Sequence, residues 1–224
     1  MSIKAIITGA TGMVGEGVLH VCLNSPDVES VLVLNRKPCG VTHPKLKEII
    51  HKDFMDLTSI EDQLAGYNAG YFCAGVSSIG KKENEYRKIT YDLTLNFANS
   101  LVQLNPEMVF TYVSGVGTDS TEKGKSMWGR VKGKTENDLL SLGFKQAYMF
   151  RPGAIIPLRG IKSRTKSYQF MYDYFMWLVK LIKAISPNSV VSTTQIGLAM
   201  INAMLKGYSK KVLRPKEIID LSNK

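Results

Sequence analysis

Residues 7–20, ITGATGMVGEGVLH, hold three glycines at even three-residue spacing, at positions 9, 12 and 15. The stretch begins within the end of an apolar run over residues 3–8, which predicts a buried strand, and it leads into a helical pattern over residues 14–23. In such a unit Gly9 permits a tight turn, Gly12 lets backbone amides approach a pyrophosphate, and Gly15 lets the helix pack closely on the sheet. The helix N-terminus adds unpaired N–H groups and partial positive charge. The stretch therefore predicts a dinucleotide site.

Strand and helix patterns alternate along the rest of the chain. Further strands are predicted at residues 30–35, 47–51, 69–74, 108–113 and 146–150, with shorter strand pieces at 189–192, 211–213 and 217–220. Further helices are predicted at residues 59–64, 83–104, 131–142, 168–185 and 194–206. Apolar strands that alternate with helices are typical of a parallel sheet covered on both faces, and right-handed crossovers make that sheet doubly wound. The sequence thus predicts one Rossmann-like α/β domain over residues 1–224, in which residues 156–190 form part of a small C-terminal substrate cap.

Composition narrows the class of partner. The chain has 224 residues, of which 44% are hydrophobic and 21% charged, as in soluble globular proteins. Its net charge is +10, but no nucleic-acid-binding motif occurs, so we expect a solvated basic surface and no nucleic-acid partner. Three cysteines and three histidines lack metal-ligand spacing, which predicts no metal site. The odd cysteine count and the lack of a secretory signal favour a cytoplasmic protein.

The segment over residues 168–185 is rich in aromatic residues and methionine. Charges at Asp173, Lys180 and Lys183 interrupt it, so it falls short of a membrane span. A helix of this composition can lie on a membrane surface, but it is more often a core, cap or dimer helix. We therefore expect no stable membrane contact, and this helix is compatible with a homodimer.

The end of the second predicted strand bears on cofactor choice. An acidic residue at this position usually holds the ribose diol of NAD, whereas this chain reads Asn35-Arg36-Lys37. Arg36 suits a bidentate contact with a 2′-phosphate, and Lys37 adds charge nearby. The sequence favours NADP over NAD, with an exposed loop cation as the alternative reading of Arg36.

Six segments together resemble the short-chain dehydrogenase/reductase superfamily. They are GATGMVGEGV at 9–18, LNRKP at 34–38, KDFMDL at 52–57, YFCAGVSS at 71–78, FTYVSGVG at 110–117 and MFRPGAI at 149–155. The resemblance is strongest to the small atypical, epimerase-like members, including the Tat-interacting-protein-like branch. It spans nearly the whole chain and is clearest over residues 3–158.

The resemblance implies a set of site residues. Ser114 falls where the family has its catalytic serine, and Lys132 falls where it has its catalytic lysine. Asp53 and Phe54 would flank the adenine, and Pro152, Gly153 and Ile155 would lie beside the nicotinamide. The remaining cofactor contacts implied are Gly9, Thr11, Gly12, Met13, Val14, Gly15, Asn35, Arg36, Lys37, Cys73, Ala74, Gly75 and Lys132. Arg151 is predicted to be structural.

The chain departs from the family at one position. The family motif is Tyr-x-x-x-Lys, whereas this chain has Trp128 four residues before Lys132, and none of its tyrosines precedes a lysine by four residues. In the family the tyrosine hydroxyl exchanges a proton with the substrate oxygen, and an indole N–H is no useful acid near neutral pH. Replacement donors include Tyr112, which shares a strand face with Ser114 or else packs in the sheet, together with Ser126, Tyr168 and water.

Two functions follow from this site. The first is an NADP(H)-dependent oxidoreductase or epimerase-like enzyme that acts on a small molecule with an altered proton donor. The second is a non-catalytic NADP(H)-binding sensor or regulatory protein. The complete cofactor framework favours the first, and the missing tyrosine favours the second.

Overall fold

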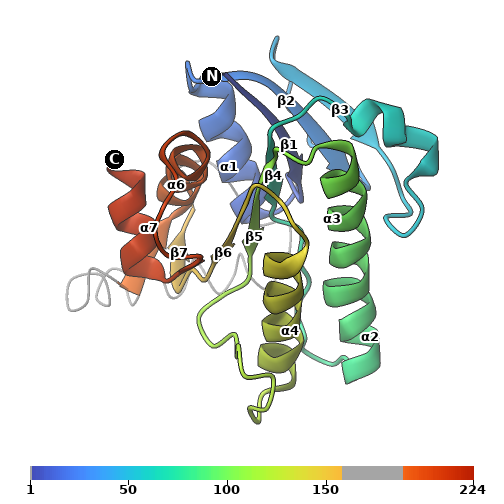
Figure 1. The fold of residues 1–224 in the computed structure, drawn as a ribbon, viewed down its shortest axis with the longest axis vertical. Helices are drawn as coiled ribbons and strands as arrows, with labels where there is room; N and C mark the ends of the chain where they lie inside the picture. The colour runs from blue at the N-terminus through green and yellow to red at the C-terminus, as the bar shows by residue number, and fades with distance from the viewer. Residues whose placement is uncertain (1, 158–188) are drawn as a thin grey trace.

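The computed structural model describes residues 2–157 and 189–224. Its main sheet has seven strands in the order β3-β2-β1-β4-β5-β6-β9, and every neighbouring pair is parallel (Figure 1). The strands are β1 (Ile3–Thr8), β2 (Val28–Asn35), β3 (Leu46–Ile50), β4 (Ala69–Phe72), β5 (Val109–Val113), β6 (Gln146–Phe150) and β9 (Val212–Leu213). The predicted doubly wound Rossmann-like sheet is confirmed.

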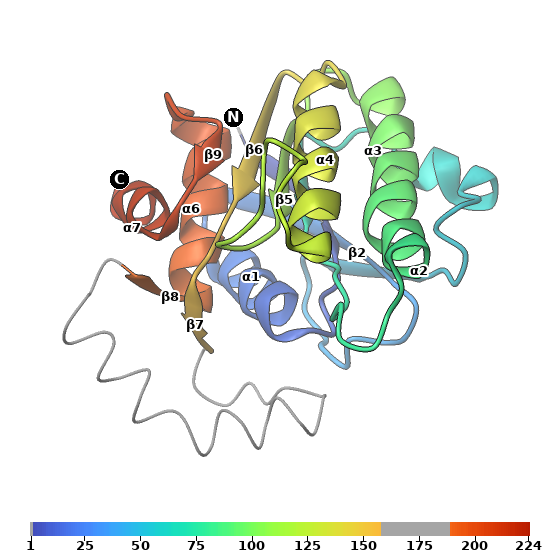
Figure 2. The ribbon, with the colours of Figure 1, turned by 90° about the horizontal axis from the view of Figure 1, so that it is seen from below.

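Helices cover both faces of this sheet (Figure 1, Figure 2). One face carries α1 (Met13–Asn24), α6 (Thr193–Lys206) and α7 (Pro215–Ser222). The other carries α2 (Glu83–Arg87), a π-helical turn η2 (Lys88–Asp92), α3 (Leu93–Leu104) and α4 (Met127–Ser141), and a 3₁₀ helix η1 (Thr58–Leu64) lies near the β3 edge. Successive strand residues point to opposite faces, so Val31 and Val33 join the core under α1 and α6, whereas Leu32 joins the core under α3.

The chain order of the sheet sets the place of a ligand site. From β1 the chain runs outward to β2 and β3, then returns to β4 on the other side of β1. A parallel sheet has a crevice at such a reversal, at the carboxyl ends of its strands, and ligands bind there. The glycine loop leaves β1 at this point.

Two predicted boundaries need correction. The predicted strand piece at 217–220 is wrong, because these residues lie in α7, where Pro215 takes the first helical position and Glu217 lies in the first turn. The predicted helix at 131–142 begins earlier, at Met127, because the Ser126 side chain caps it by accepting a hydrogen bond from Gly129 N. Trp128 and Lys132 therefore share α4.

A second, two-stranded sheet pairs β7 (Ala154–Ile156) with β8 (Val190–Ser192) in parallel. The predicted strand piece at 189–192 is β8, but it pairs outside the main sheet, and β7 was not predicted. The predicted helix at 168–185, the candidate donor Tyr168 and most of the predicted cap lie outside the described residues. Over residues 2–157 and 189–224, no helix is long and apolar enough to cross a membrane.

Candidate functional site

A cleft of about 920 Å³ opens at the carboxyl ends of the central strands. This volume lies in the range of small-molecule and cofactor sites. The cleft is formed by the glycine loop after β1 and by the segments that follow β4, β5 and β6, with α4 on one side. Its lining comprises Thr11, Gly12, Met13, Val14, Cys73, Gly75, Val76, Ser77, Ile79, Lys81, Val113, Ser114, Gly115, Val116, Trp128, Lys132, Pro152, Gly153 and Ile155.

The glycine loop has the geometry that its spacing predicts. Gly9 has φ +72°, and a Cβ there would lie 2.6 Å from Ala74 N. A Cβ on Gly15 would lie 2.2 Å from Gly9 O, closer than side-chain atoms come to a carbonyl. Gly12 N donates to Gly9 O at 2.9 Å, and no side chain caps the N-terminus of α1. The backbone N–H groups at this helix start are thus free of side-chain competition for an anion.

A smaller hollow adjoins the cleft and shares Gly75 and Val76 with it. The exposed side chain of Arg36 lines this hollow, as do Phe54 and Ala74. This is where the adenine end of a dinucleotide is expected, and Arg36 is the cation on its rim.

Three other residues predicted to contact this end lie differently. The Asn35 side chain is buried and donates to Glu48 at 3.4 Å. Asp53 is exposed, and its carboxylate accepts from Met55 N at 2.9 Å, which orders the loop around Phe54. Lys37 is exposed and lines neither hollow.

Lys132 and Ser114 meet inside the cleft. Lys132 Nζ donates to the Ser114 carbonyl at 2.7 Å. The Ser114 hydroxyl donates to the Glu136 carboxylate and lies 3.2 Å from Phe150 O. Burial lowers the pKa of the Lys132 ammonium to about 8, and the Glu136 charge acts in the opposite direction.

Glu136 is a site residue that the sequence reasoning missed. It is 1% exposed and pairs with Arg151, whose Nε lies 3.1 Å and 3.0 Å from the two carboxylate oxygens. The Arg151 guanidinium also donates to Ser120 Oγ. Arg151 is therefore structural in its contacts, as predicted, and acts through Glu136 on Ser114. The spacing of Glu136, one helical turn after Lys132, was the available signal.

Two of the candidates to replace the tyrosine, Tyr112 and Ser126, lie among the described residues, and neither lines the cleft. Tyr112 is 1% exposed, packs against Phe72 in the core and does not line the cleft. Burial raises the pKa of its phenol further above the ordinary value. Ser126 is the N-cap of α4, faces solvent and is likewise outside the cleft lining. The structure does not support either residue as a donor into the cleft.

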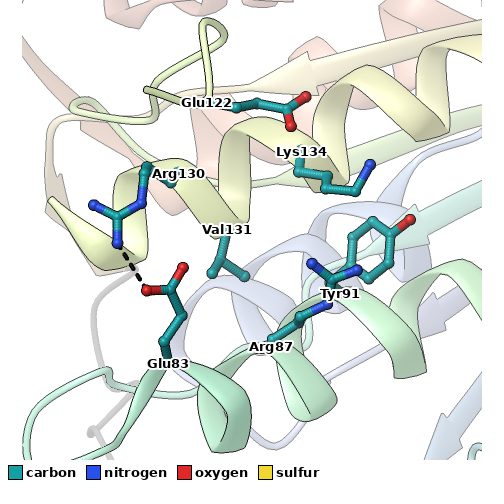
Figure 3. A pocket seen from close by; sticks show the side chains of 7 residues that line it. All are labelled: Glu83, Arg87, Tyr91, Glu122, Arg130, Val131 and Lys134. Atoms are coloured by element: carbon teal, nitrogen blue, oxygen red, sulfur yellow. Dashed lines mark hydrogen bonds and ion pairs between the residues drawn. The ribbon is translucent and has the colours of Figure 1, made fainter. Parts of the chain in front are cut away.

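A third hollow lies between α2 and α4 (Figure 3). Arg130 reaches Glu83 at 2.7 Å, and the Arg87 guanidinium lies 4.6 Å from the Tyr91 ring centroid. Lys134 pairs with Asp138 at 3.0 Å. The cations that line this hollow therefore already have partners, and the ion pair between Arg130 and Glu83 links α4 to α2. Among the described residues, no group of histidine, cysteine and carboxylate side chains has the arrangement of a metal site.

The fold and the cleft define a protein with the NAD(P)-binding fold of epimerases and dehydratases. The sequence model of the NAD dependent epimerase/dehydratase family matches residues 5–126, more than half of the chain. The chain belongs to this family.

Several curated relatives are fungal proteins. The chain is 26% identical over 196 residues to protein FMP52, mitochondrial, of Candida albicans, covering 84% of each chain. It is 26% identical over 214 residues to protein fmp52, mitochondrial, of Emericella nidulans, covering 92% of this chain and 89% of the relative. The expectation of a cytoplasmic protein is wrong on this comparison, because these relatives are named as mitochondrial proteins.

Solved structures share the fold at low identity. The enzyme WbmF of Bordetella bronchiseptica, in complex with NAD+, superposes with a TM-score of 0.72 at 14% identity, covering 99% of this chain and 77% of that chain. A UDP-N-acetylglucosamine 4-epimerase from Methanobrevibacter ruminantium, in complex with UDP-N-acetylmuramic acid, gives 0.71 at 16% identity, covering 95% and 76%. These similarities concern the fold.

Proposed function

We propose that the protein is an NADP(H)-dependent oxidoreductase or epimerase-like enzyme that acts on a carbonyl or alcohol group of a small molecule. The observation that carries this proposal is the hydrogen bond from Lys132 Nζ to the Ser114 carbonyl, in the cleft that the glycine loop also lines. The pair joins the two retained members of the family's catalytic set at the nicotinamide end of the site.

The described residues fit a nicotinamide dinucleotide. Gly9 and Gly15 leave no space for side chains where the loop must be tight, whereas a Cβ on Gly75 would meet nothing within 4 Å. The glycine loop would hold the pyrophosphate, and Pro152, Gly153 and Ile155 would lie beside the nicotinamide. Bound there, the cofactor supplies or accepts a hydride.

We further propose that the cofactor is NADP(H) because Arg36 lines the adenine-end hollow and none of the described residues that line it carries a carboxylate. An aspartate or glutamate would hold the ribose diol of NAD, and a guanidinium suits the extra phosphate of NADP. The solved neighbour WbmF is described with NAD+, so the two proteins would differ in cofactor.

We assign the other site residues roles in binding and orienting the substrate. Lys132 carries positive charge into the cleft, where it would bind ribose hydroxyls and the substrate oxygen. Ser114 holds Lys132 through its carbonyl, and Glu136 holds Ser114 through its hydroxyl. Trp128 provides an apolar wall where the family has a polar hydroxyl, which keeps water from that side of the substrate.

A screen of aldehydes, ketones and quinones with NADPH tests the enzymatic proposal. Oxidation of NADPH that depends on both protein and substrate supports it. If NADPH binds and none of these classes is reduced, the second candidate, an NADP(H)-binding sensor, is the better account. Trp128 at the cleft wall is the observation that favours that second candidate.

We also propose a mitochondrial location, as in the names of the curated relatives. Fractionation of cells that express the full chain tests this. Co-sedimentation with a mitochondrial matrix or membrane marker supports it, and recovery in the cytosolic fraction alone contradicts it.

A further inference from the structure

No tyrosine is among the described residues that line the cleft, so the other side chains that carry a transferable proton are the candidates for donating it to the substrate. Among the described lining residues, these are Thr11, Cys73, Ser77, Lys81, Ser114, Trp128 and Lys132. The Ser114 hydroxyl proton is engaged by the Glu136 carboxylate. Burial raises the pKa of the Cys73 thiol to about 12.

Lys132 has the placement that direct proton transfer requires. It lies one helical turn after Trp128 on α4, and both side chains line the cleft. An ammonium carries three N–H groups, and the bond from Nζ to the Ser114 carbonyl uses one of them. That bond fixes the nitrogen at the depth of the cleft where Ser114 lies.

We propose that Lys132 is the proton donor of the reaction, delivering a proton from Nζ directly to the substrate oxygen; this role rests on the oxidoreductase activity proposed above. In the family the lysine acts through a tyrosine. Here Trp128 occupies the tyrosine position, and the ammonium of Lys132 follows one helical turn later on the same helix.

The step balances for carbonyl reduction. When bound, a reduced nicotinamide would supply the hydride, and with it the two electrons, that the carbonyl carbon accepts. The electron pair of the C=O double bond moves onto oxygen, which forms an O–H bond as an N–H bond of Lys132 breaks. Lys132 is left as a neutral amine and regains its proton from water at the open side of the cleft. Alcohol oxidation runs through the same groups in reverse.

The charges around Lys132 suit an acid that works near neutral pH. Burial lowers its pKa to about 8, because the charged form loses hydration. From α4 itself the Glu136 carboxylate favours the charged form, and the same carboxylate pairs with Arg151, which directly follows β6. The other titratable groups in the described cleft lining are Cys73 after β4 and Lys81 beyond it.

Competitive labelling tests the acid without turnover. The whole protein is treated with trace acetic anhydride across pH 6–11, and the labelling of each lysine is read by mass spectrometry. Lys134 is the matched control on α4, because its bond to Asp138 raises its pKa. We expect Lys132 to show a pKa at least one unit below that of Lys134. Equal pKa values for the two lysines would overturn the proposal.

Chemical rescue tests the proton step itself. We expect Lys132→Ala to lose about 10²–10⁴-fold in turnover, and methylammonium to restore part of that loss in proportion to its concentration. Tetramethylammonium, which has no N–H group, should restore nothing. Lys132→Met serves as a second variant that keeps the apolar stem, and NADPH titration verifies that each variant still binds cofactor. Lys134→Ala should keep wild-type turnover.

The outcomes separate the two proposals. If wild-type protein binds NADPH and reduces no carbonyl substrate, the enzymatic proposal fails, and the proton donor fails with it. If wild-type protein turns over and both Lys132 variants keep that rate, only the proton donor is overturned. The same holds if both ammonium ions rescue equally, because charge rather than a proton would then be what the cleft needs.

Discussion

The carboxylate of Glu136 accepts hydrogen bonds from both the guanidinium of Arg151 and the hydroxyl of Ser114. The side chains of the ion pair are 1% and 8% exposed. The pair thus links α4 to the residue that directly follows β6, and the Glu136 carboxylate fixes the direction of the Ser114 hydroxyl.

Breaking this pair should destabilise the protein strongly. Arg151→Met leaves an unpaired buried carboxylate, and such changes cost about 3–5 kcal/mol. Urea unfolding at pH 7 measures the loss. The control is Glu107→Ala, whose partner Lys145 is 51% exposed while Glu107 is 76% exposed, and which should change stability by less than about 1 kcal/mol. Equal effects of the two substitutions would contradict the placement of Glu136 and Arg151 in the interior.

Restoring the family's hydroxyl should raise turnover. Trp128→Tyr places a phenol one helical turn before Lys132, where the cation lowers the phenol pKa and makes it a better acid. We expect the rate to rise about tenfold or more, since a positioned general acid typically contributes about 10²–10⁴-fold. Trp128→Phe is the control, because it removes the indole and adds no hydroxyl. A gain in both variants would mean that space, not the hydroxyl, limits the rate.

Substitutions at Gly15 and Gly75 should have different effects, one on stability and the other on cofactor affinity. Gly15→Ala forces a Cβ to within 2.2 Å of Gly9 O, so we expect a loss of about 1–3 kcal/mol in unfolding free energy. A Cβ on Gly75 meets nothing within 4 Å, so Gly75→Ala should keep its stability. Its methyl group would enter the cleft where we propose that the cofactor binds, and should weaken NADPH binding. Thermal unfolding and NADPH titration of both variants check this. Full NADPH affinity in Gly75→Ala would contradict the assigned cleft.

The buried ammonium of Lys132 should give stability a specific dependence on pH. Its pKa is lowered from 10.5 in the unfolded chain to about 8 in the folded protein. The unfolded state therefore binds more protons between pH 8 and 10.5, and the contribution of Lys132 to stability rises with pH across that window. Relative to wild type, Lys132→Met should be more stable below pH 8, and this advantage should shrink by about 1–3 kcal/mol towards pH 10.5. Urea unfolding of both proteins from pH 7 to 10.5 measures the difference, and a constant difference would contradict the buried charge.

Local patterns in the sequence predicted the sheet and brought together several residues that line the cleft. The strand, glycine turn and helix over residues 3–24 are one continuous segment, so spacing alone carries their geometry. The carboxyl ends of parallel strands meet at one edge, which is why Cys73, Ser114 and Pro152 could be placed together from their positions after strands.

Other features depend on contacts between distant segments, which spacing does not encode. Glu136 and Arg151 are fifteen positions apart in the chain, and no sequence pattern indicates that they form a pair. Tyr112 shares a strand with the segment leading to Ser114, but aromatic packing against Phe72 decides its environment. The helix at 215–222 was missed because its short apolar pattern suits a strand equally, although Pro215 and Glu217 are ordinary helix-start residues.

The central claim is that the cleft binds NADP(H) with Arg36 at the 2′-phosphate, and a fluorescence titration of the protein with NADPH and with NADH tests it most directly. We expect NADPH to bind more tightly than NADH. Arg36→Ala should weaken NADPH binding by about 10- to 100-fold, corresponding to about 1.5–3 kcal/mol for a charged hydrogen bond, and leave NADH binding unchanged. Lys47→Ala, an exposed cation on β3, is the control and should change neither affinity. Equal affinities for the two cofactors, unaltered by Arg36→Ala, would contradict the claim.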